Sequence, residues 1–92
     1  MTQLGRLIRE IQRDAAALPT DALRTEIGVS LEVMDAAIGQ FHNIRPGAGN
    51  LRELIDASSE VMLAVLTTAL YVRELTSRPA EHRIARVHLS LN

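Results

Sequence analysis

The side chains that could carry out catalysis or bind a metal are few in this sequence, and their spacing forms no recognisable site. Cysteine is absent, which excludes a thiolate nucleophile, a disulfide and any Cys-ligated zinc or iron–sulfur centre. His82 and His88 miss the four-residue spacing that would place two imidazoles on one helical face. No phosphate-binding glycine loop or nucleophile–base motif is present. The sequence therefore predicts no enzyme activity, no cofactor and no metal site.

The residues from Thr20 to Phe41 give the clearest structural pattern, because they read as two short helices joined by a tight turn. Gly28 lies where the chain would reverse, since a residue without Cβ adopts the left-handed conformation at no steric cost. Ser30 can then cap the second helix. The pattern predicts that two crossed helices bury five side chains together: Leu23, Ile27, Val29, Met34 and Ala37.

The segment LRTEIGVS, residues 23–30, resembles the L-A-x-x-x-G-V-S core of bacterial helix-turn-helix and winged-helix regulators. With the preceding helix, the resemblance covers Leu4 to Phe41, and it departs from the family at Arg24, where a small residue is usual. It implies a DNA-binding head whose second helix faces the major groove. The positions that would contact DNA or another partner are Ser30, Leu31, Glu32, Asp35, Ala36 and Gly39.

The charge pattern leaves the partner of this head open. None of the six positions is basic and two are acidic, whereas phosphate contacts are made mainly by Lys and Arg. The chain has a net charge of −1 and a pI near 6.3. Arg83 and Arg86 lie in the most basic stretch and could contact phosphate or an acidic partner. A DNA-binding transcriptional regulator is one hypothesis, and a protein-interaction module that uses the acidic face of the head is the other.

Helix-breaking residues divide the rest of the chain. The apolar residues of Gln3–Leu18 recur at three- and four-residue steps, which predicts an amphipathic helix that ends before Pro19. The loop that follows Phe41 contains no pair of alternating strands of useful length, so a wing is either vestigial or displaced. Asn50 and Glu53 form a capping-box signal that predicts a long helix over Leu51–Ser77.

Apolar residues encircle this long helix from Val61 to Val72, and a chain of 92 residues cannot cover them on all sides. We therefore expect a homodimer. Its predicted interface is formed by Val61, Met62, Val65, Leu66, Ala69 and Leu70. The β-branched content of 61–72 leaves a strand as the alternative to a helix. Residues 84–91 fit either a short helix or a strand.

Together these patterns predict one all-α domain over residues 1–92. A helix-turn-helix head occupies 2–42, a dimerisation helix 50–77 and a C-terminal segment 79–92. In outline this resembles the small winged-helix proteins associated with bacterial ferrous-iron transport, without the cysteines of many of them. The absence of a signal peptide and the short apolar run, Val61 to Val72, predict a cytoplasmic protein that does not enter a membrane.

Overall fold

The computed structural model describes residues 2–79 and contains three α-helices and one 3₁₀ turn in that range, without strands. The helices are α1 (Gln3–Ala17), α2 (Thr20–Asn43) and α3 (Leu51–Ser77), and the 3₁₀ turn η1 (Ala48–Asn50) precedes α3. The all-α prediction is confirmed for these residues. Residues 80–92 of the predicted C-terminal segment, with Arg83, Arg86 and the helix-or-strand alternative at 84–91, lie outside the described residues.

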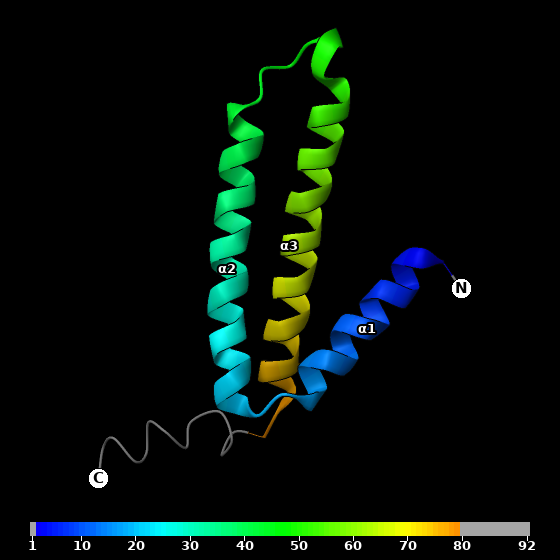
Figure 1. The fold of residues 1–92 in the computed structure, drawn as a ribbon. Coiled ribbons are helices and arrows are strands. Elements are labelled where there is room, and N and C mark those ends of the chain that lie inside the picture. Colours follow the sequence, from blue (N-terminus) through cyan, green and yellow to red (C-terminus); the bar gives the residue numbers. More distant parts are fainter. Residues whose placement is uncertain (1, 80–92) are drawn as a thin grey trace.

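Helices α2 and α3 run antiparallel along most of their length, and α1 packs beside the C-terminal half of α3 at an angle (Figure 1). The Cα atoms fill a slab of 59 × 34 × 14 Å. Helix α3 packs against both α2 and α1, whereas α1 and α2 make few contacts with each other, so the three helices form a single row with α3 in the middle (Figure 1). Most domains pack two layers around a core. Here the described residues provide only one.

The α2–α3 hairpin is held together by side chains that repeat every seven residues. On α2 the buried residues are Leu23, Ser30 and Ala37, and on α3 Ala57 and Ala64 have the same spacing. A seven-residue repeat keeps one stripe of each helix facing its partner, as in a coiled coil. Most of these side chains are small, which allows the helix axes to approach closely but buries little apolar area.

Two hydroxyl groups meet in the middle of this seam. Thr68 Oγ1 donates to Ser30 Oγ at 3.0 Å, and Ser30 Oγ donates to the Ile27 carbonyl at 2.9 Å. The Thr68 hydroxyl can also donate to the Ala64 carbonyl, which lies 2.8 Å from Oγ1. Each of the two buried hydroxyl groups therefore has an acceptor. This contact fixes which residues of α2 and α3 lie opposite one another.

The predicted turn at Gly28 is wrong, because Thr20–Asn43 forms one uninterrupted helix of 24 residues. Gly28 does not have a positive φ, and Ser30 is buried in the seam instead of capping a second helix. Glycine costs a helix about 1 kcal/mol relative to alanine. Packing against α3 over the whole length of α2 outweighs that local preference. The described residues therefore contain no helix-turn-helix between positions 20 and 43.

The other helix boundaries agree closely with the sequence prediction. α1 ends at Ala17 just before Pro19, and α3 has the predicted bounds Leu51–Ser77, so the strand alternative for 61–72 is wrong. The capping box is also wrong, since the Asn50 side chain makes no cap bond to α3. Instead its amide group donates to the Arg45 carbonyl and ties the loop together.

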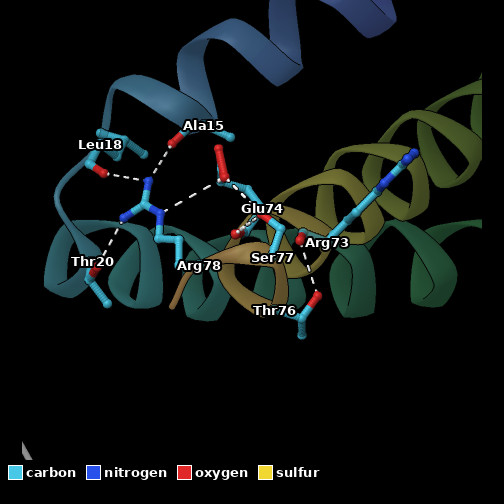
Figure 2. Close-up of polar contacts among 8 residues, drawn as sticks. All are labelled: Ala15, Leu18, Thr20, Arg73, Glu74, Thr76, Ser77 and Arg78. Carbon is cyan, nitrogen blue, oxygen red and sulfur yellow. Dashed lines mark hydrogen bonds and ion pairs between the residues drawn. The ribbon is translucent and has the colours of Figure 1, made fainter. Parts of the chain in front are cut away.

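Arg78 joins all three helices at the end of the hairpin where the chain enters α2 (Figure 2). Its guanidinium donates to the Ala15 carbonyl at 3.1 Å, to the Leu18 carbonyl at 2.7 Å and to Thr20 Oγ1 at 3.0 Å. Glu74 lies 3.9 Å from its Nε. The Ala15 carbonyl also accepts from the backbone N–H of Leu18 at 3.2 Å, so Arg78 adds a second donor there and supplies a donor to the Leu18 carbonyl just beyond the helix.

Candidate interaction surfaces

The single layer leaves both sides of the α2–α3 hairpin without a covering helix. Helical spacing assigns most of the exposed apolar residues to these two sides, on either flank of the buried seam. Ile55 and Met62, each two residues before a seam alanine, extend the second side round α3 to the surface that points away from α2. We name the two sides the groove face and the opposite face. The groove face carries Val29, Val33, Ala36, Leu63 and Thr67, and the opposite face carries Leu31, Ile55, Met62, Val65 and Val72.

The groove face is hollowed along the seam into a groove of about 490 Å³. Val29 and Val33 form part of its α2 wall, Leu63 part of its α3 wall, and Ser30 and Ala64 lie at its floor. Val33 remains 55% exposed and Leu63 47% exposed. Large exposed side chains that converge on one concave surface are typical of a site that binds another apolar surface.

Carboxylates supply all the charge of the groove. Glu26 and Glu60 line it, and Gln40 lies between it and a second hollow of about 360 Å³ towards the loop. That second hollow is lined by Glu53 and Asp56 as well as Glu60. No basic side chain of residues 2–79 lines either hollow. The groove face is therefore apolar at its centre and uniformly acidic at its margins.

The opposite face has a different character on α3. Its stripe follows the three- and four-residue steps of a helix and contains no charged residue from Leu51 to Val72. Met62 is 70% exposed there. On α2 the same side carries Leu31, together with Arg24 and Asp35 at its edge. A long uncharged stripe can pair with an identical stripe without bringing like charges together.

The structure places the residues of the predicted dimer interface in three environments. Met62, Val65 and Ala69 are exposed and share the opposite face. Leu66 is half-buried on the outer side of α3, and Val61 is half-buried in the seam against α2. Leu70 is buried next to α1, near Ala16. Only the first three form a free surface.

The six residues predicted to contact DNA or a partner do not share one surface, because they lie around a single helix. Ser30 is buried in the seam, Leu31 belongs to the opposite face and Ala36 lines the groove. The other three positions are exposed on the side of α2 that points away from α3: Glu32, Asp35 and Gly39.

The groove residues were not selected from the sequence. The signal that could have identified them is the seven-residue spacing of Leu23, Ser30 and Ala37, which marks the seam. Positions beside a seam form the edges of a hairpin, so Glu26 and Val33 on α2 and Glu60 on α3 follow from it. The seven-residue spacing indicates one continuous helix, whereas Gly28 indicates a local turn.

No cluster of three or more His, Asp or Glu side chains within residues 2–79 could hold a metal ion. Among residues 2–79, the lining of the groove includes the hydroxyl groups of Ser30, Thr67 and Tyr71 and no His, Lys or Arg. The arrangement of the groove is suited to binding an apolar surface between charges.

Helix α3 is long and apolar enough to cross a membrane by length and composition alone, with a mean hydropathy of 1.4 over its most apolar 18 residues. Core helices of globular proteins pass the same test, but they are mostly buried, whereas 11% of this window is buried. A single such helix is weak support for a span. The uncharged stretch from Val61 to Val72 is only about 18 Å long as a helix, against a hydrocarbon core of about 30 Å. The prediction that the protein does not enter a membrane stays a prediction.

Comparisons with family models, curated proteins and solved structures give no match to this chain. The resemblance to helix-turn-helix regulators therefore has no support beyond the sequence of residues 4–41.

Proposed function

We propose that this chain is a non-catalytic protein-interaction module that forms a homodimer through the opposite face of its hairpin. The observation that supports this most strongly is the uncharged stripe of α3, on which Ile55, Met62 and Val65 are exposed. Apolar side chains grouped on one face cost free energy in water, at about 25 cal/mol per Å². Pairing two copies of the stripe removes that cost from both.

The thin core of one copy also supports self-association. Leu23 is the only large side chain of residues 2–79 that is almost fully buried, at 0% exposure. A chain of this size is marginally stable even with a full core. A second layer of helices would provide the two-layer packing that most domains have.

Light scattering of the full chain tests this proposal. The wild type should have twice the mass of one chain at micromolar concentration. Met62→Asp should give the mass of one chain, because a carboxylate in the paired stripe would lose its hydration without a partner. Gln3→Asp, an exposed change in the first turn of α1, should leave the mass doubled. A wild type that is a folded monomer at these concentrations contradicts the proposal.

The alternative of a DNA-binding transcriptional regulator is supported by one feature of α1. Arg6, Arg9 and Arg13 are all exposed, and their three- and four-residue spacing puts them on one stripe. Such a stripe could contact the phosphates of a duplex. This version of the DNA hypothesis uses α1 in place of the helix-turn-helix head.

A salt titration with a random-sequence duplex distinguishes the two functions. Binding to DNA should weaken steeply as salt rises, because each phosphate contact releases counterions. Neutralising the arginine stripe, or Arg83 and Arg86, should reduce both the affinity and its salt dependence. No binding of the wild-type chain at low salt rules out the DNA hypothesis.

A further inference from the structure

The register of the hairpin determines where the two groove carboxylates lie. Ser30 pairs with Thr68 and Thr20 pairs with Arg78, so both helices advance by ten residues between these contacts, 20 to 30 and 68 to 78. On this register Glu60 of α3 lies level with position 38 of α2. Glu26 is twelve residues away along the hairpin, which is about 18 Å at 1.5 Å per residue.

Glu26 and Glu60 therefore flank the groove at opposite ends and on opposite walls, one on α2 and the other on α3. The apolar side chains of Val29, Val33 and Leu63 lie between them. The distance of about 18 Å corresponds to a little over three turns of an α-helix. A bound helix that forms ion pairs with both carboxylates thus needs an apolar stripe of three turns with a positive charge near each end.

A second copy of the same face does not meet this requirement. Its margins carry Glu26, Glu53, Asp56 and Glu60 and no basic side chain among the residues lining the two hollows. Stacking two groove faces would bring carboxylates together, and like charges across an interface oppose association. The groove calls for a partner of opposite charge.

We propose that the groove binds a basic amphipathic α-helix of another protein. The apolar stripe of that helix packs on Val29, Val33 and Leu63, and Arg or Lys side chains on its two flanks pair with Glu26 and Glu60. This mode lays an amphipathic helix into an apolar groove formed by two others. The inference depends on the proposed role as an interaction module, and it does not depend on self-association through the opposite face.

Two synthetic peptides test the inference with the full-length chain. Each is an eighteen-residue alanine-based helix with Leu along one stripe, and the flanking residues are Arg in one peptide and Glu in the other. Fluorescence anisotropy at low ionic strength should show at least tenfold tighter binding of the Arg peptide. Equal binding of the two peptides, or no binding of the Arg peptide, overturns the proposal.

Charge-neutral variants then locate the binding site. Glu26→Gln with Glu60→Gln should weaken binding of the Arg peptide about tenfold, since these carboxylates flank the groove. Glu32→Gln is the matched control on α2, because Glu32 is exposed and does not line the groove. A change of the same size in the control would mean non-specific charge attraction and overturn the proposal.

A further variant tests whether the chain's own basic residues compete for the groove. Arg83→Gln with Arg86→Gln should leave the affinity for the Arg peptide unchanged. Tighter binding by tenfold would identify residues 80–92 as the occupant and overturn an external partner. Light scattering of Met62→Asp reports self-association separately, so a failed peptide test and a failed dimer test can be told apart.

Discussion

Arg78 Nη2 donates to the carbonyl oxygen of Leu18 at 2.7 Å, across 60 residues of sequence. The same guanidinium reaches Ala15 and Thr20, so one side chain at the end of α3 joins the end of α1 to the start of α2 (Figure 2). Its positive charge also lies at the C-terminus of α1, where the helix dipole favours a cation. These hydrogen bonds tie the end of α1 to the start of α2, whereas the body of α1 packs on α3.

Replacing Arg78 by alanine should lower the free energy of unfolding by about 1.5–3 kcal/mol, the usual range for hydrogen bonds to a charged group. The side chain is only 14% exposed, so water replaces it poorly. Arg78→Lys should recover less than half of the loss, because an ammonium group lacks the planar fork of the guanidinium. Urea denaturation at one fixed protein concentration measures the free energy of unfolding of the wild type and of the two variants.

The control for this prediction is Arg73→Ala, which removes an exposed arginine from α3, five residues before Arg78. It should change the unfolding free energy by less than about 0.5 kcal/mol. An Arg78→Ala variant as stable as this control would mean that the contacts around Leu18 contribute nothing to the fold.

The seam between α2 and α3 should reject larger side chains. Ala64 is 7% exposed in the seam, and its carbonyl lies 2.8 Å from Thr68 Oγ1. Ala64→Leu should destabilise the chain by about 1–3 kcal/mol through overpacking, and Ala17→Leu at an exposed position of α1 should not. Thermal unfolding followed by circular dichroism compares them. A seam that accepts leucine at 64 without loss would be loosely packed, contrary to the structure.

The apolar residues of α3 should separate into those that stabilise one chain and those that join two. Leu70 is buried beside α1 at 9% exposure, so Leu70→Asp should unfold the chain whatever its oligomeric state. Met62→Asp should leave the helical circular dichroism signal largely intact and change only the mass. If both variants remain folded and dimeric, neither residue has the role given to it here.

Local signals predicted the ends of the helices well, because proline and loop residues act on the chain near them. Pro19 stops α1, Pro79 follows α3, and the loop before Asn50 separates α2 from α3. These effects need no knowledge of the rest of the fold. The bounds of α1 and α3 could therefore be predicted from the sequence.

Whether α2 is continuous or broken by a turn could not be predicted in the same way, because two signals conflict there. Gly28 and the residues Val29 and Ser30 favour a turn locally, whereas the repeat of Leu23, Ser30 and Ala37 favours a continuous stripe. Only the partner helix decides between them, since a stripe is stabilised by what it packs against. The groove depends on that decision, and so do the roles of Glu26 and Glu60.

Glycine substitutions test the continuous helix directly. Gly28 and Gly39 lie within α2 without a positive φ, and a Cβ added at either position meets no atom within 4 Å. Alanine should therefore stabilise the chain by about 0.5–1 kcal/mol at each site, through a less flexible unfolded state and a better helix former. A tight turn at Gly28 in the left-handed conformation predicts the reverse sign there, because a Cβ would strain it. Gly39→Ala serves as the reference in either case, since no turn was predicted at that position. Denaturant midpoints raised by both substitutions support one helix over Thr20–Asn43, and a midpoint lowered by Gly28→Ala alone would restore the helix-turn-helix.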